Sequence, residues 1–381
     1  MPTDAPLVPG EPAGLVDHHC HGVVETDLDR AAFEDLITES SVPAAPGCSF
    51  FDTQVGLAVR AHCAPVLDLP AFAPAEDYVA RRADLGAVEV NRRFLRSGGF
   101  AELLVETGHL GDRILGLDAM AERSGAVVRE VVRLEQVAES VADRIGDAAG
   151  EYPETLRSAL AARLPAAVGV KTIAAYRGGF GFPQERPSDD AVVGAYESWR
   201  QEIRATRQIR ITDPILIAFG VWSAVDHGVP IQVHVGYGDA DLDLHRCNPL
   251  LLTDLIRATQ GSGASFTLLH CYPYHREAGY LAHVFPHVYC DVGLAINYTG
   301  FQSPQVLAES LELTPWHKAL FSSDAWGAAE LYHLGALLFR RGLAHCRETW
   351  FRDTALPDDE WQRIIDLIGS GNARRLYGLD S

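Results

Sequence analysis

Short apolar runs alternate along this chain with longer stretches whose apolar residues recur at helical spacing. Seven of the runs are too short for helices and are expected to be buried strands: 101–105, 127–135, 166–174, 229–235, 265–271, 287–294 and 318–324. The segment LVDHHCH at 15–21 is an eighth. Strands that alternate with helices form a parallel sheet, and eight of them predict an α/β fold of the (β/α)8 TIM barrel type.

The length of 381 residues suits one such barrel or two average domains. No repeat or low-complexity linker divides the chain, so we expect a single barrel domain over 1–381. Residues from about 65 to 98 hold no strand pattern and are expected to form a helical insertion after strand 1. An open doubly wound sheet is disfavoured, because no glycine-rich phosphate turn follows the first strand.

The formal net charge of −19 argues against nucleic acid or an anionic membrane as a partner. We therefore expect a small-molecule ligand, and the sequence leaves room for a homo-oligomer. The first 14 residues lack the basic and apolar regions of a signal peptide, and no apolar run reaches the ~18 residues of a membrane span. A cytoplasmic location follows, and the seven scattered cysteines indicate no disulfide framework.

The first predicted strand carries an aspartate and alternate histidines. Successive side chains of a strand point to opposite faces, so Asp17, His19 and His21 are expected on one face and His18 and Cys20, as packing residues, on the other. Two imidazoles at this spacing can bind one metal ion, and Asp17 can orient one of them.

Four more polar residues end later strands: Lys171, His234, His270 and Asp324. The active sites of TIM barrels lie at the carboxyl ends of the strands, so these residues are expected to meet His19 and His21. Lys171 and Lys318 are the only lysines among 32 basic residues. A lysine kept in an arginine-rich chain suggests amine chemistry, including carbamylation.

The order H-x-H, K, H, H, D, followed by GNARRLYGL at 371–379, resembles the metal-dependent amidohydrolase superfamily. The resemblance implies metal ligands at His19, His21, His234, His270 and Asp324, and a carbamylated Lys171 that bridges two metals. Segments 170–181, 234–244, 270–282 and 322–336 are similar to the amidohydrolase (amino-terminal) half of FluG-like and nodulin–glutamine synthetase fusion proteins. This implies hydrolysis of a γ-glutamyl amide or a similar C–N bond in a small carboxylate-bearing substrate.

A divalent metal held by neutral imidazoles makes hydroxide available at neutral pH. Asp324 is expected to take the proton of the attacking water and pass it to the leaving amine, while His270 helps to hold the developing oxyanion. Zinc suits these ligands best, with manganese or iron as alternatives. If Lys171 is a free ammonium, one metal is expected in place of two.

Specificity is expected to come from the loops that follow the strands. Arg177 suits a substrate carboxylate, and four further residues are predicted at the same cavity mouth: Tyr176, Tyr237, Asp239 and Trp326. Glu106 and Glu135, taken as the ends of strands 2 and 3, are candidate extra carboxylates. The remaining histidines, His109 among them, are expected to be structural or exposed.

Two rival functions remain open. The same superfamily contains non-hydrolytic metal-dependent decarboxylases, although those relatives usually lack the lysine on strand 4. A non-catalytic barrel that binds a metal or ligand is the second rival, and it gives no reason for the presence of Asp324.

Overall fold

The structure is a computed structural model that describes residue 12 and residues 14–379. The expectation about a signal peptide, drawn from residues 1–14, therefore lies almost wholly outside the described residues. Among those described, no helix combines the length and apolar character needed to cross a bilayer.

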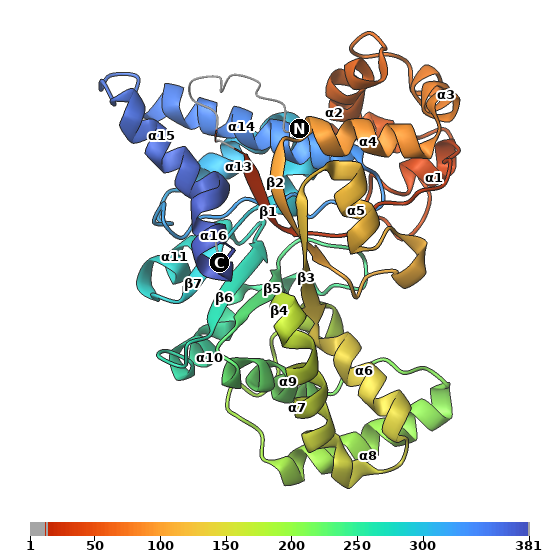
Figure 1. The fold of residues 1–381 in the computed structure, drawn as a ribbon, viewed down its shortest axis with the longest axis vertical. Coiled ribbons are helices and arrows are strands. Elements are labelled where there is room, and N and C mark those ends of the chain that lie inside the picture. The colour runs from red at the N-terminus through yellow and green to blue at the C-terminus, as the bar shows by residue number, and fades with distance from the viewer. Residues whose placement is uncertain (1–11, 13, 380–381) are drawn as a thin grey trace.

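A curled parallel sheet lies at the centre of the molecule, with helices around it (Figure 1). Its strands follow one another in chain order, as expected for successive strand–helix units. The strands are β1 Leu15–Cys20, β2 Phe100–Glu106, β3 Val127–Arg133, β4 Ala167–Thr172, β5 Pro230–Val235, β6 Ser265–His270 and β7 Val288–Cys290. Each lies within or next to a predicted apolar run, so the strand predictions for these seven are confirmed.

The remaining predicted run, 318–324, forms no regular strand but lies between β7 and β1. Its Leu320 N–H donates to the carbonyl of Cys290 in β7, and its Phe321 carbonyl accepts from His18 N–H in β1. We call residues 318–325 the closing segment. Asp324, near its carboxyl end, has a positive φ of 49°.

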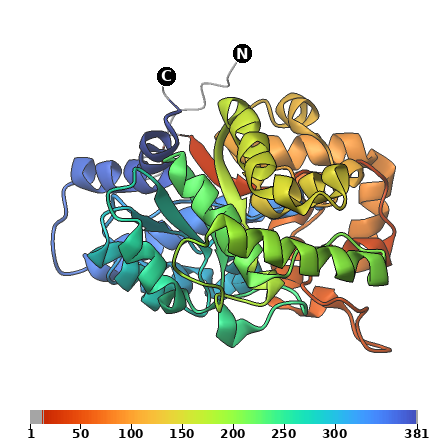
Figure 2. The same ribbon diagram turned by 90° about the horizontal axis from the view of Figure 1, so that it is seen from below.

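Helices follow the strands and form the outer layer (Figure 2). The amino terminus of α9 is capped by residues suited to that position. The Asp213 side chain accepts hydrogen bonds from the N–H groups of Ile215 and Leu216, and Pro214 occupies the first turn. The helices are α1 Arg30–Glu34, α2 Gln54–Ala58, α3 Ala75–Leu85, α4 Ala87–Ser97, α5 Leu117–Ser124, α6 Leu134–Ile145, α7 Tyr152–Arg163, α8 Asp189–Thr206, α9 Pro214–Asp226, α10 Thr253–Ala258, α11 His275–Val284, α12 Gly293–Thr299, α13 Ser303–Ser310, α14 Glu330–Trp350, α15 Asp358–Asp366 and α16 Asn372–Tyr377.

The segment between β1 and β2 contains α1 to α4. Of these, α4 packs against α5 and α14 in the outer layer, as the helix of a regular strand–helix unit does. The insertion over about 65–98 therefore stays a prediction, since the second half of that segment occupies an ordinary position.

The carboxyl-terminal helix closes the amino end of the sheet. Tyr377 of α16 packs with apolar side chains from β1, β2, β3 and the closing segment: Val16, Leu104, Val131 and Leu320. These side chains fill the interior of the sheet at this end.

Lys318, one of the two lysines, is used as a triple donor. Its ammonium donates to the carbonyl oxygens of Phe285 at 3.0 Å, Val288 at 3.2 Å and Pro286. Three rotatable donors on one atom suit three carbonyls that converge on a point, whereas a planar guanidinium fork does not. Hydrogen-bond geometry thus explains why position 318 holds a lysine in a chain that otherwise uses arginine almost throughout.

We expect Lys318→Met to lower the free energy of unfolding by roughly 1–3 kcal/mol, the usual cost of leaving buried acceptors unsatisfied. Urea unfolding of the variant and the wild type measures this difference, with Arg257→Met, an exposed residue of α10, as the control. A loss below about 0.5 kcal/mol, typical of surface substitutions, would contradict the role of Lys318.

Candidate metal centre

Strand β1 does not alternate strictly, because its register with β2 shifts within residues 17–20. A bulge of this kind turns two consecutive side chains toward the same side. His18 Nδ1 lies 3.1 Å from the Tyr377 hydroxyl, and His19 Nδ1 lies 2.8 Å from Gln232 Oε1, while Gln232 also contacts Tyr377. The prediction that His18 packs on the opposite face from His19 is therefore wrong.

The role predicted for Asp17 is also wrong. Its carboxylate accepts hydrogen bonds from the backbone N–H and the hydroxyl of Ser323 in the closing segment. The bulge turns it away from the imidazoles, and Gln232 contacts His19 in its place. Cys20 is buried, as predicted.

Six predicted side chains meet at the carboxyl end of the sheet: His19, His21, Lys171, His234, His270 and Asp324. Asp324 lies among the histidines, with Oδ1 3.0 Å from His19 Nε2 and 3.5 Å from His21 Nε2, and Oδ2 3.5 Å from His270 Nε2. Lys171 Nζ lies 2.7 Å from His19 Nε2. The ring centroids of His234 and His270 are 4.5 Å apart. The prediction that these six residues meet at the strand ends therefore agrees with the structure.

Two of these residues have an unusual backbone conformation. His270 and Asp324 have positive φ angles of 68° and 49°, which are uncommon for residues with a side chain. Hydrogen bonds hold them: His270 N–H donates to Asp291 Oδ1 at 2.8 Å, and Asp324 N–H donates to the His19 carbonyl at 3.1 Å. Strain that the surroundings maintain in this way is typical of functional sites.

The cluster fits a divalent metal. Ligand atoms of His19, His270 and Asp324 all lie within 4.8 Å of one another. His234 Nε2 and both ring nitrogens of His270 are buried without a hydrogen-bond partner in the described part of the chain. Buried polar atoms without partners are costly, and a cation among these nitrogen and oxygen donors would satisfy them.

The protonation states also suit a cation. Burial lowers the pKa of His19 and of His234 to about 3, so both imidazoles are neutral at physiological pH. Burial opposes ionisation of Asp324, but His270 and the contacts with His19 and His21 hold its pKa well below the usual range. The cluster therefore offers neutral nitrogen lone pairs next to a carboxylate.

The two extra carboxylates proposed from the sequence differ in outcome. Glu106 Oε2 lies 3.3 Å from His21 Nδ1, and Glu106 also forms an ion pair with Arg133. Glu106 therefore contacts the nitrogen of His21 that faces away from Asp324. Glu135 lies in the first turn of α6, not at the end of β3, and it accepts a hydrogen bond from the Thr172 hydroxyl. It contacts none of the clustered histidines in any described hydrogen bond or ion pair.

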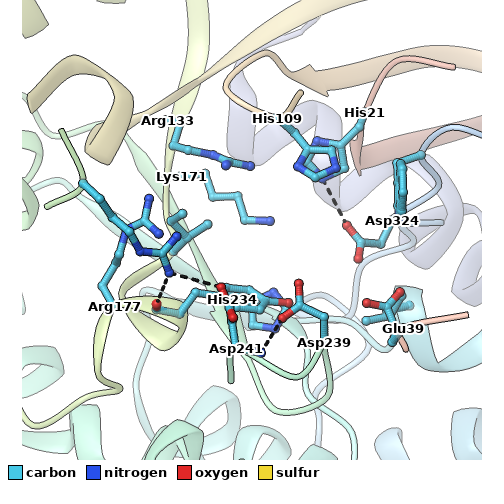
Figure 3. A pocket seen from close by; sticks show the side chains of 15 residues that line it. His21, Glu39, His109, Arg133, Lys171, Arg177, His234, Asp239, Asp241 and Asp324 are labelled. Carbon is cyan, nitrogen blue, oxygen red and sulfur yellow. Dashed lines mark hydrogen bonds and ion pairs between the residues drawn. The ribbon is translucent and has the colours of Figure 1, made fainter. Parts of the chain in front are cut away.

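A cavity of about 260 Å³ opens beside the cluster (Figure 3). Of the predicted specificity residues, Tyr176, Arg177, Asp239 and Trp326 line it. Tyr237 does not, and its ring packs 5.7 Å from that of Tyr298. The remaining lining residues are His21, Glu39, His109, Arg133, Lys171, Ile173, Arg210, His234, Asp241, Leu294 and Asp324.

Several lining residues were missed. His109 was expected to be structural or exposed, but its ring lies 5.0 Å from that of His21 and 5.1 Å from that of Trp326. Glu39, from the long segment after β1, faces the same cavity, and burial raises its pKa to about 8. Neither residue directly follows an apolar run, which was the signal that identified the other residues.

Comparison with known proteins agrees with the geometry. A family model described as amidohydrolase matches residues 16–379. Protein fluG of Emericella nidulans is 25% identical over 419 residues, which cover 96% of this chain and 46% of fluG. The chain thus spans about half the length of that relative.

Solved structures resemble the whole chain. A candidate metal-dependent hydrolase from Lactobacillus casei has a TM-score of 0.84 and 29% identity, covering 97% of this chain and 96% of its own. Glucuronate isomerase from Caulobacter crescentus shares the fold, with a TM-score of 0.64, 14% identity and coverage of 98% and 92%. Because the family model spans nearly the entire chain, this protein belongs to the amidohydrolase family.

Proposed function

We propose that this protein is a metal-dependent hydrolase that cleaves an amide C–N bond of a small carboxylate-bearing substrate. The observation that carries the proposal is the cluster of unpartnered imidazole nitrogens and an ionised Asp324 in the wall of a cavity that arginines also line. On this proposal the closing segment serves as the eighth strand of a (β/α)8 barrel, because its backbone bonds to both β7 and β1.

His19, His21, His234, His270 and Asp324 would hold the metal, with zinc as the favoured ion and manganese or iron as alternatives. A divalent metal there lowers the pKa of water from ~15.7 to about 7 and polarises a carbonyl. Asp324 takes a proton from the attacking water. It then returns that proton to the nitrogen as the C–N bond breaks, so that a carboxylic acid and an amine leave.

Lys171 is proposed to be carbamylated and to bridge two metals. Burial lowers the pKa of Lys171, and the neutral amine is the form that reacts with carbon dioxide. The 2.7 Å contact between Lys171 Nζ and His19 Nε2 supports this role. If it stays an ammonium, it repels a second cation, and His270 is then free to hold the developing oxyanion.

The charges of the cavity favour a γ-glutamyl amide. Arg177 lines one side and suits the α-carboxylate: its side chain is only 9% exposed and pairs with Glu139 through Nη2 at 3.3 Å, while its Nε is buried without a partner among the described residues. Asp239 lies toward the other side (Figure 3) and suits the α-ammonium group. A γ-glutamyl amide carries both groups next to one scissile bond.

The test combines metal analysis with a substrate panel. Elemental analysis gives metals per chain, and intact mass under gentle conditions detects the added carbon dioxide on Lys171. The panel pairs γ-glutamyl amides with analogues that lack the α-carboxylate or the α-amine, and release of free amine is measured against release of carbon dioxide. Amine release that requires the carboxylate supports the proposal, whereas carbon dioxide release would favour a decarboxylase.

A further inference from the structure

Gln232 is a fully buried polar residue in β5, where every other residue except His234 is apolar. It stands two positions before His234 in β5 and therefore points to the same side of the sheet. Its side chain makes three contacts: Oε1 lies 2.8 Å from His19 Nδ1, and Nε2 lies 2.7 Å from the His18 carbonyl and 2.9 Å from the Tyr377 hydroxyl.

These contacts decide which way the amide group faces. The carbonyl oxygen of His18 can only accept a hydrogen bond, so the Gln232 atom beside it must be the NH₂ nitrogen. The amide oxygen is then the atom beside His19 Nδ1. Because an amide oxygen only accepts, His19 must carry a proton on Nδ1.

The other side of the His19 ring agrees. Lys171 Nζ lies 2.7 Å from His19 Nε2, and an amine or ammonium at that distance donates to a lone pair. A neutral ring with its proton on Nδ1 keeps the Nε2 lone pair, which lies beside both Lys171 Nζ and, at 3.0 Å, Asp324 Oδ1. That lone pair faces the centre of the cluster, where it can bind a metal.

We propose that Gln232 is the positioning residue that holds His19 in the Nδ1-protonated form, with Nε2 free for the metal. The inference rests on the proposed metal-dependent function. Partners of this kind fix the tautomer and ring orientation of a metal-binding histidine, and their loss typically weakens metal binding by ~10–100-fold.

A buried network fixes Gln232 in turn. The Tyr377 hydroxyl that contacts Gln232 also lies 3.1 Å from His18 Nδ1, and His18 Nε2 lies 2.7 Å from Asp291 Oδ2. The second oxygen of Asp291 accepts from the His270 N–H. Helix α16, which carries Tyr377, thus connects the surroundings of two proposed metal ligands, His19 and His270.

The test measures zinc affinity by competition with a chromophoric chelator. Gln232→Met keeps a similar volume but removes the acceptor, so we expect the zinc dissociation constant to rise about 10- to 100-fold. Gln232→Glu keeps an acceptor oxygen and should restore most of the affinity. Ser223→Ala is the control, since Ser223 is buried in α9 and its hydroxyl donates to the Phe219 carbonyl of the same helix.

The ¹⁵N chemical shifts of His19 in the metal-free wild type report the tautomer directly and do not require Gln232→Met to fold. Protonation at Nδ1 supports the proposal, whereas protonation at Nε2 overturns it. Zinc binding of wild-type strength in Gln232→Met also overturns it. If the wild type itself binds no zinc, the proposed function fails, and the shifts still decide the role of Gln232.

Discussion

Asp324→Asn is expected to lower kcat for amide hydrolysis by about 10²–10⁴-fold, the range that general acid–base groups contribute. The carboxylate has a pKa well below the usual range and stays ionised through the physiological pH range, so it can accept a proton from water. An asparagine side chain keeps an oxygen in the same place but cannot take the proton.

Metal content separates the catalytic role from a structural one. If Asp324→Asn keeps its metal and its circular dichroism spectrum, the lost rate belongs to proton transfer. Asp254→Asn provides the control, because Asp254 is exposed in α10 and pairs with Arg257. A variant with metal bound and kcat within tenfold of the wild type would contradict the role of Asp324.

The strand-end residues were predictable because two independent rules apply to them. Apolar runs identified the strands, and polar residues at the ends of parallel strands share one edge of a sheet. Lys171, His234, His270 and Asp324 each follow such a run, and the structure brings them together with His19. The run at 318–324, within the closing segment, was recognised for the same reason, although it forms no regular strand.

The geometry of β1 could not be predicted in the same way. Nothing in the residues Asp-His-His-Cys-His distinguishes a regular strand from a bulged one, since bulges depend on the pairing with β2. That single irregularity changed the neighbours of both Asp17 and His18. Gln232, by contrast, left a usable signal: it is a polar residue inside a buried apolar strand, two positions before a proposed ligand.

Glu39 and His109 illustrate a different limit. Both lie in connecting segments, where side-chain direction follows from tertiary packing and not from periodicity. His109 lies beside His21 because the segment after β2 folds over the strand ends. The sequence therefore predicted the candidate metal cluster better than the remainder of the cavity, where the specificity of the proposed hydrolase would be decided.

His19→Ala is expected to remove the metal itself. His19 Nε2 contacts both Lys171 and Asp324, so its loss opens a gap between the proposed bridging group and the carboxylate. The zinc dissociation constant should rise by more than the ~10–100-fold that is typical when a hydrogen-bond partner of a metal ligand is lost. The rate of hydrolysis should fall in proportion to the metal content. Equilibrium dialysis with zinc measures the affinity.

His283→Ala is a matched control, because His283 is an exposed histidine of α11 that contacts the Leu313 carbonyl. The comparison with Gln232→Met is informative, because that variant keeps the His19 ring and should lose less affinity. If His19 is a ligand and Gln232 its supporting partner, zinc affinity should be highest in the wild type, lower in Gln232→Met and lowest in His19→Ala. Full metal content and full rate in His19→Ala would show that the metal does not bind in this cluster.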